Sequence, residues 1–303
     1  MVSLPLTGGG VLLLNGCGLR GAGSPGFPLL GAAHRRTLEH PIQRPIQRQI
    51  QRQIQRMGLR MRLSDFRILT FDTYGTLIDW ETGILTAMEP LIARKTPRPS
   101  ADDALEVFGR AETHYEAAEP GLVYSDLLGK VYRKAAGEWG VEVPDDEARA
   151  VGRSVKAWPA FADAPEALKY LRRHFLMATL TNCDRISYMG SNARLEIEWD
   201  AIYTAQDVGS YKPSARNFDF MLERLRADFG IRPHEILHVA QSLTHDHVPA
   251  TKAGLTKVWI DRRHDKEGFG ATVPPGEDYR LEFQFNSMAD FAAAHRAEQS
   301  AGA

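Results

Sequence analysis

The chain has 303 residues, of which 43% are hydrophobic and 25% are charged, so it is long enough for one sizeable α/β core or for a core with a smaller inserted domain. Its 37 basic and 38 acidic residues leave a net charge of -1, which excludes the overall positive field typical of proteins that bind nucleic acid or anionic membranes. No run approaches the ~20 consecutive apolar residues of a membrane-spanning helix, so we expect neither nucleic acid nor a membrane as a partner.

The first part of the chain indicates a tail rather than a folded domain. Residues 41–56 read PIQRPIQRQIQRQIQR, a four-residue repeat that cannot keep one apolar face on a helix with 3.6 residues per turn. We therefore predict a disordered, basic, low-complexity tail over residues 1–62.

Cysteine usage and the charge of the tail bear on location. Cys17 and Cys183 have neither the spacing of a zinc site nor that of a framework of bridges, which predicts a reducing, cytoplasmic environment. Residues 1–60 hold eight arginines and one acid, Glu39, the charge bias of a mitochondrial presequence. Their glycines, prolines and scarce serines weaken that comparison, so mitochondrial targeting is the minor alternative.

Short apolar runs begin at residue 66 and recur along the chain. They read FRILTF at 66–71, FLMATL at 175–180, AIYTA at 201–205, ILHVA at 236–240 and KVWI at 257–260. Helical patterns such as APEALKYLRRHF and SARNFDFMLERLRADFG separate them. Strands that alternate with helices predict a parallel sheet covered on both faces, the Rossmann-like, doubly wound α/β architecture.

Residues 82–158 interrupt this alternation, because they read as successive helices without a convincing strand. Ligands of open α/β sheets bind beyond the carboxyl ends of the strands, and an insertion that leaves the sheet after its first strand lies over that crevice. We therefore predict a helical cap at 82–158, inserted into a core formed by residues 63–81 and 159–295.

Polar residues with catalytic potential follow the predicted strands. The first strand leads into DTYGTL at 72–77, the second into Thr181 and Asn182, and the strand at 236–240 into QSLTHD at 241–246. Lys212 lies in the loop GSYKP. A carboxylate such as Asp72 can attack carbon or phosphorus and form a covalent intermediate, and a nearby lysine favours its ionised form. Thr76 and Thr181 can donate hydrogen bonds that orient the carboxylate or the substrate.

These motifs, in this order, resemble those of the haloacid dehalogenase superfamily of hydrolases, and the resemblance spans residues 66 to about 290. It implies that Asp72 is the nucleophile. Phosphatases of the superfamily carry a second aspartate two residues after the nucleophile and a Gly-Asp pair after the last motif strand. This chain has Tyr74 and Ala240-Gln241 at those positions, so it lacks both the general acid and one carboxylate that would help to hold Mg²⁺.

A halide leaving group needs neither protonation nor Mg²⁺, and the DTYGTL motif resembles the L-2-haloacid dehalogenase (type II) branch. The resemblance implies that Asp72 displaces halide from C2 of a small 2-haloacid, and that water hydrolyses the ester to a 2-hydroxy acid. It implies no metal and no cofactor. In that branch a cap arginine receives the halide, and Arg110 in FGRAETHY matches it best. The resemblance also implies a homodimer formed through the cap, which the residues themselves do not indicate.

Two departures from that branch change the predicted pocket. The tyrosine expected six residues after the lysine is Phe218, and the Ser-Asn pair expected before the last aspartate is replaced within QSLTHD. We predict that His245 is the base for the hydrolytic water, because an imidazole with an ordinary pKa of about 6.5 suits proton transfer near neutrality. The predicted catalytic residues are Asp72, Thr76, Lys212, His245 and Asp246; the predicted substrate-binding residues are Tyr74, Arg110, Thr181, Asn182, Gln241 and Ser242.

Structural and functional alternatives stay open at this point. A magnesium-dependent phosphatase acting on a small phosphate ester is the second function, and a non-catalytic relative that binds a small acid or a protein is the third. The structural alternatives are a turn cap for Asp72, a solvated loop lysine for Lys212, a helix cap for Asp246, a surface arginine for Arg110, backbone contacts for Thr76 and Thr181, packing for Cys183, and loop histidines rather than metal ligands for His245 and His247.

Overall fold

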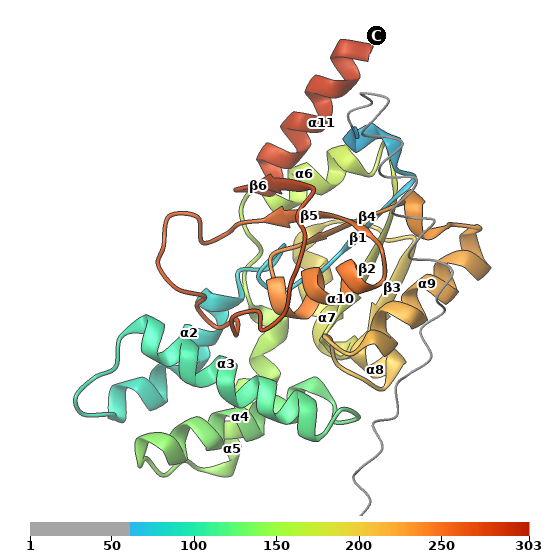
Figure 1. Cartoon of the computed structure of the whole chain (residues 1–303). Coiled ribbons are helices and arrows are strands. Elements are labelled where there is room, and N and C mark those ends of the chain that lie inside the picture. Colours follow the sequence, from blue (N-terminus) through green and yellow to red (C-terminus); the bar gives the residue numbers. More distant parts are fainter. Residues whose placement is uncertain (1–60, 303) are drawn as a thin grey trace, which may run out of the picture. The chain divides into compact units, whose positions relative to one another are not determined.

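The computed structural model of the protein describes residues 61–302; the tail predicted before them, with Cys17, lies outside the described residues. The described chain forms a six-stranded sheet in which all five strand pairs are parallel, in the order β3-β2-β1-β4-β5-β6 (Figure 1). This order confirms the predicted doubly wound α/β sheet. The strands are β1 (Ile68–Phe71), β2 (Leu176–Thr181), β3 (Ala201–Thr204), β4 (Ile236–Ala240), β5 (Thr256–Ile260) and β6 (Phe283–Phe285).

The central strand β1 explains why the apolar runs read as continuous rather than alternating. Ile68 lies opposite Leu176 of β2 on one side and Ile236 of β4 on the other, and all four residues of β1 are buried. A strand that is covered on both faces favours apolar side chains on both of them, and the buried polar Thr70 of β1 has a hydrogen-bond partner in His238. The edge strand β6 was not predicted, because it has three residues and pairs with β5 alone. In this pair Val258 of β5 lies opposite Phe283 of β6.

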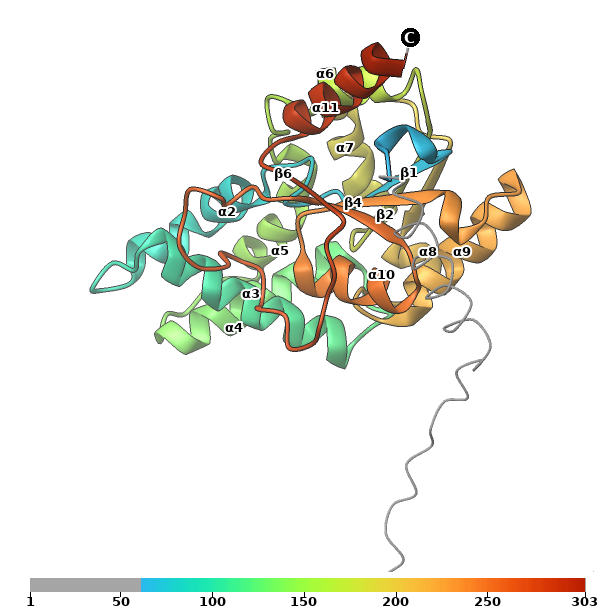
Figure 2. The same ribbon diagram turned by 45° about the horizontal axis from the view of Figure 1, so that its top comes forward.

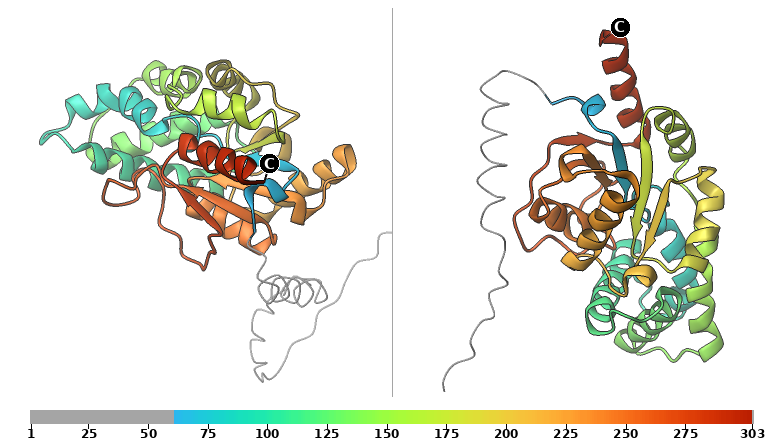
Figure 3. Two further views of the ribbon diagram at one scale, coloured as in Figure 1. Left: turned by 90° about the horizontal axis from the view of Figure 1, so that it is seen from above. Right: turned by 90° about the vertical axis from the view of Figure 1, so that its right-hand side faces the viewer.

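Helices cover both faces of the sheet (Figure 3). Leu69 and Phe71 of β1 pack on one face with α6 (Ala164–Leu171), α7 (Arg185–Leu195) and α11 (Met288–Gly302). Ile68 belongs to a second apolar cluster on the other face, with α9 (Ala215–Phe229) and α10 (Val248–Lys252). Because side chains of a strand point alternately to its two faces, one strand takes part in both clusters. The remaining short elements are α8 (Ala205–Val208), η1 (Leu63–Asp65), η2 (Val155–Ala157), η3 (Pro233–Glu235) and the π-helical turn η4 (Leu243–His247).

Four helices lie between β1 and α6 along the chain, and we call them the helical insertion (Figure 2). They are α2 (Trp80–Arg94), α3 (Ala101–Ala118), α4 (Tyr124–Trp139) and α5 (Asp145–Ser154). Local signals fix their ends: Asp79 caps α2, Ser100 and Asp103 form a capping box at α3, and Gly140 ends α4 in the left-handed conformation. Within residues 61–302 no helix is long and apolar enough to cross a membrane.

Candidate active site

Asp72 lies directly after β1, at the carboxyl edge of the sheet, and is 6% exposed. Its backbone N–H donates to Val239 O of β4 at 3.0 Å, which continues the parallel ladder by one residue. The chain then turns sharply at Gly75, where φ is +85° and the N–H donates to Ile78 O at 2.8 Å. A side chain at this position would be strained, and its Cβ would lie 3.0 Å from Trp80 Nε1. The turn therefore holds Asp72 at the mouth of the crevice.

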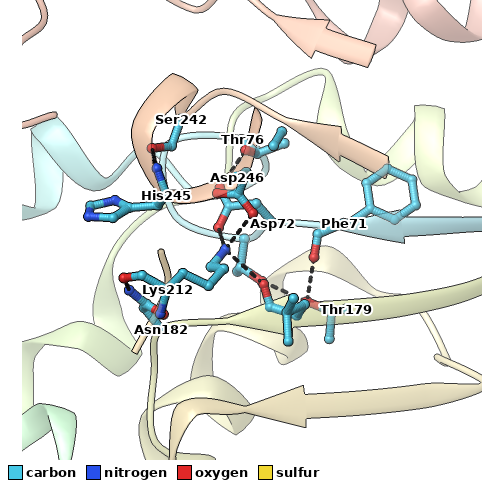
Figure 4. Close-up of polar contacts among 12 residues, drawn as sticks. Phe71, Asp72, Thr76, Thr179, Asn182, Lys212, Ser242, His245 and Asp246 are labelled. Atoms are coloured by element: carbon cyan, nitrogen blue, oxygen red, sulfur yellow. Dashed lines mark hydrogen bonds and ion pairs between the residues drawn. The ribbon is translucent and has the colours of Figure 1, made fainter. Parts of the chain in front are cut away.

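Lys212 joins this carboxylate to that of Asp246. The buried Nζ atom donates to Asp72 Oδ1 at 2.9 Å, to Asp246 Oδ1 at 2.8 Å and to Leu180 O at 3.0 Å (Figure 4). A lysine ammonium has three N–H donors. All three are used, and two of them hold carboxylates.

Asp246 lies on the π-helical turn η4 after β4 and is fully buried. Its Oδ1 also contacts His238 Nε2 at 3.0 Å, and His238 Nδ1 contacts Thr70 Oγ1 at 2.9 Å. Because an ionised carboxylate only accepts, His238 Nε2 carries a hydrogen and donates it to Asp246 Oδ1. Asp246 Oδ2 is buried without a hydrogen-bond partner. Sequence reasoning missed His238, although a polar residue inside the apolar strand ILHVA was the available signal.

Thr76 orients the second oxygen of the nucleophile. Its hydroxyl donates to Asp72 Oδ2 at 2.6 Å and accepts from the Gln241 backbone N–H at 2.9 Å. Because the Thr76 oxygen accepts from the Gln241 N–H, the Thr76 hydroxyl hydrogen can point to the Asp72 carboxylate. Both oxygens of Asp72 therefore accept a hydrogen bond.

Burial and neighbouring charges shift the pKa values of Asp72, Lys212 and Asp246 from their ordinary values. Burial raises the pKa of Asp72 from its ordinary value, against the opposing effect of Lys212. Burial also opposes the charges of Lys212 and Asp246, but the ion pairs prevail: the pKa of Lys212 is raised, and the Lys212 ammonium with His238 holds the pKa of Asp246 well below its ordinary value. Lys212 favours ionised Asp72 as the sequence suggested, but burial has the larger effect.

A cavity of about 30 Å³ lies between these residues and the helical insertion. A water molecule needs about 10–15 Å³ of such space, so the cavity is large enough for at least one. Its lining is Asp72, Tyr74, Trp80, Glu112, Glu116, Tyr124, Asn182, Lys212, Gln241, Ser242, His245 and Asp246. Of the predicted site residues, Thr76 supports the lining from behind, while Thr181 and Arg110 do not line the cavity.

Helix α3 contributes two buried carboxyl groups to the cavity. Glu112 Oε1 accepts from Tyr124 OH at 2.6 Å, and Glu116 Oε1 accepts from Asn182 Nδ2 at 2.8 Å. Burial raises the pKa of Glu112 to about 7, against the opposing hydrogen bond from Tyr124. Burial and the neighbouring Glu112 raise the pKa of Glu116 well above its ordinary value. Sequence reasoning missed both residues, although they continue the buried row formed by Ala104 and Phe108 at i, i+4 spacing.

Asn182 connects the core to the helical insertion. Its Oδ1 accepts from the Lys212 backbone N–H at 2.7 Å, and its Nδ2 donates to Lys212 O at 3.0 Å as well as to Glu116. Tyr74 also lines the cavity, but its hydroxyl is engaged elsewhere, 2.9 Å from Ser191 Oγ and 3.2 Å from Cys183 Sγ. Burial raises the pKa of Tyr74 well above its ordinary value, which keeps the phenol protonated.

His245 faces the same cavity from η4. Its backbone N–H donates to Ser242 Oγ at 3.0 Å, which fixes the start of the turn. Its ring Nε2 lies 3.5 Å from Glu116 Oε2, and both atoms are buried without a hydrogen-bond partner. Burial lowers the pKa of His245 to about 4, well below the value assumed from sequence, so the imidazole is neutral and a weak base at neutral pH.

The position of Arg110 contradicts the role predicted for it from the sequence. Its side chain is 53% exposed and pairs with Glu106 at 3.6 Å and Glu138 at 2.7 Å on the surface of the helical insertion. The prediction that Arg110 binds the halide is wrong, because this side chain points to solvent. Glu112 and Glu116 of the same helix face the cavity instead.

The residues present do not fit a bound magnesium ion, the metal that the phosphatase alternative would require. Mg²⁺ requires several oxygen ligands. Lys212 and Thr76 occupy both oxygens of Asp72, and Lys212 and His238 occupy Oδ1 of Asp246, which leaves Oδ2 of Asp246 as the one oxygen of these two aspartates without a hydrogen bond. Within the described part of the chain no group of three His, Cys, Asp or Glu residues is arranged to hold a metal. His247, the other histidine considered from sequence, donates from Nε2 to Ala240 O at 2.9 Å and so has a structural contact.

Known proteins resemble this chain over most of the described residues. The family model described as haloacid dehalogenase-like hydrolase matches residues 66–254. The rhythmically expressed gene 2 protein of Drosophila melanogaster is 21% identical over 263 residues, covering 76% of this chain and 95% of that protein. The (S)-2-haloacid dehalogenase 4A of Burkholderia cepacia is 23% identical over 236 residues, covering 75% and 94%. The crystal structure of a defluorinating L-2-haloacid dehalogenase has a TM-score of 0.61 and 21% identity, covering 78% of this chain and all of that one, which shows a shared fold.

Proposed function

This chain belongs to the haloacid dehalogenase-like hydrolases, and we propose that it hydrolyses a carbon–halogen bond in a small organic substrate through an ester on Asp72. The three contacts of the Lys212 ammonium are the observation that carries this proposal. They hold Asp72 in place and compensate its charge in a buried site. The chemistry then requires a leaving group that departs as a stable anion.

In the first step the Asp72 carboxylate attacks the carbon that bears the halogen. A C–O bond forms, the carbon–halogen bond breaks, and its electron pair leaves on the halide. Displacement of an alkoxide would need a proton donor, but the Tyr74 hydroxyl at the corresponding position is engaged with Ser191 and Cys183. This arrangement favours a halide over an alcohol as the leaving group.

In the second step water attacks the carbonyl carbon of the Asp72 ester. The ester bond breaks, the hydroxylated product leaves, and the water oxygen stays on Asp72. The proton released by the water needs an acceptor at the cavity. Three buried atoms there have no hydrogen-bond partner, Glu116 Oε2, Asp246 Oδ2 and His245 Nε2, and we assign the proton to His245 Nε2, which faces the cavity from η4.

The experiment that tests this function measures halide release from chloroacetate and chloroacetamide in the presence of EDTA. Hydrolysis of p-nitrophenyl phosphate with added Mg²⁺ is measured in parallel. We expect halide release that EDTA does not reduce. Phosphate release that depends on Mg²⁺, without halide release, would contradict the proposal and favour a phosphatase.

Replacing His245 by alanine is expected to slow hydrolysis of the ester by on the order of 10²-fold while leaving its formation intact, since a positioned base acts on the water. One equivalent of halide should then appear in a fast phase, and the mass of the protein should increase by that of the substrate-derived alkyl group esterified to Asp72. His234→Ala, at an exposed histidine, is the control. Full steady-state turnover by His245→Ala would remove His245 from this role.

Replacing Arg110 by alanine is expected to change kcat/KM for halide release by less than about twofold, because exposed ion pairs contribute little. The substitution removes two surface pairs, with Glu106 and Glu138, and no residue of the cavity. A large rise in KM for a haloacid would restore the role first assigned to this arginine.

A further inference from the structure

The side of the cavity formed by the helical insertion differs from what a negatively charged substrate requires. We infer that the cavity selects an uncharged substrate, in which a primary amide or a similar hydrogen-bonding group stands where a 2-haloacid has its carboxylate; this inference rests on the proposed hydrolysis of a carbon–halogen bond. It follows from three features of the residues that line the cavity: their cations, their acids and their unpartnered atoms.

Within residues 61–302 no free cation lines the cavity. Among the described residues that line it, Lys212 is the sole lysine or arginine. Its three N–H groups are already bound to Asp72, Asp246 and Leu180 O. A carboxylate entering the cavity would leave water without gaining a charged donor, and burying an uncompensated charge is costly.

Two acids occupy the face where a carboxylate-binding group is needed. Glu112 and Glu116 are 3% and 6% exposed and lie on α3 one turn apart, so that both carboxyl groups line the cavity. With Asp72 and Asp246 ionised, Lys212 compensates one of the two charges. A further anion would therefore meet net negative charge at short range in a low-dielectric site, where repulsion is strong.

The unpartnered atoms on this face are hydrogen-bonding groups that a neutral ligand can satisfy. Glu116 Oε2 and His245 Nε2 lie 3.5 Å apart, are buried, and have no partner within the described chain. A primary amide offers two N–H donors and one carbonyl acceptor, whereas a carboxylate offers acceptors alone. The amide can donate to these two atoms, whereas a carboxylate can donate to neither.

Binding of propionamide and propionate to the wild-type protein tests this selection without any chemistry, because neither ligand carries a leaving group. The two ligands have nearly the same size and differ in charge. Ligand-observed NMR titrations at pH 8 are expected to give a dissociation constant for the amide at least about tenfold lower than for the acid. Equal affinities, tighter binding of propionate, or no detectable binding of propionamide would overturn the inference.

Two variants of α3 separate this effect from general surface charge. Glu116→Gln keeps the shape of the side chain and removes its acid, so it is expected to bring the two dissociation constants closer together. Glu106→Gln removes an acid from the exposed face of the same helix and is expected to leave the ratio unchanged. If Glu116→Gln unfolds, Glu112→Gln tests the same effect, because glutamine retains an acceptor for the Tyr124 hydroxyl. If neither Glu112→Gln nor Glu116→Gln changes the ratio of the two dissociation constants, the two acids are not the cause of the selection.

Halide release distinguishes failure of this inference from failure of the proposed function. If the wild-type protein prefers propionamide but releases no halide from chloroacetamide or chloroacetate, the selection stands and the dehalogenase function falls. If it releases halide and binds propionate more tightly, the function stands and the selection falls.

Discussion

Replacing Asp72 by asparagine is expected to reduce halide release by on the order of 10³-fold or more, because a neutral amide cannot form the ester on which both steps depend. Asparagine preserves the shape of the side chain and can still accept from Lys212 through its oxygen, so the fold should persist. Halide release under saturating substrate measures the loss. Mass spectrometry of protein quenched during turnover should show the alkyl ester of Asp72 in the wild type and no adduct in the variant.

Asp219→Asn is a matched control, since Asp219 is exposed on α9 and does not line the cavity. It is expected to retain wild-type turnover and to show the adduct. If Asp72→Asn released halide at a wild-type rate, the nucleophile would have to be another residue and the proposed mechanism would fail.

Replacing Lys212 by methionine is expected to destabilise the protein at pH 7 by about 3–5 kcal/mol and to abolish activity, because it leaves two buried carboxylates without their counter-ion. Methionine fills a similar volume, so the effect comes from charge rather than from an empty space. Urea unfolding of the wild type and the variant measures the difference. Lys252→Met, which removes an exposed pair with Glu277, should cost less than about 1 kcal/mol.

The pH dependence of Lys212→Met has a definite sign. In the wild type the folded-state pKa of Asp246 is below its unfolded value of about 3.9, so this group stabilises the fold above that value and the contribution is lost as the pH falls through the lower folded pKa. Without the ammonium, burial raises the folded pKa values of Asp72 and Asp246 above the unfolded value. The variant should therefore recover unfolding free energy as the pH falls from 7 toward 5. A difference from the wild type that does not narrow over this range would contradict the electrostatic explanation.

Much of the fold could be predicted because its signals are local. Five apolar runs gave the five longer strands, and their alternation with helices gave the parallel, doubly wound sheet. Asp72, Lys212 and Asp246 come together because parallel strands bring their carboxyl ends to one edge. Strand β6 has no comparable signal, since its pairing with β5 depends on the chain returning to the sheet edge after a long loop.

The helical insertion could not be read in the same way, because the face that a helix turns toward a cavity is set by tertiary packing. Arg110 and Glu112 are two residues apart, which corresponds to about 200° around a helix. An error of two positions therefore replaces an exposed arginine by a buried acid and reverses the charge of the site. The pKa of His245 was misjudged for a related reason, since burial rather than residue type sets its value of about 4.

The distance along the chain between Asp72 and its partner has a consequence for how the protein is made. Asp72 and Lys212 are 140 residues apart, and Thr70 and His238 are 168 apart. The ribosome completes β1 and the entire helical insertion before it reaches either partner. Until then the nucleophile has no counter-ion and its burial is unfavourable. The site can therefore assemble only once the chain through β4 has emerged, and catalytic competence in a nascent or refolding chain should coincide with closure of the central sheet.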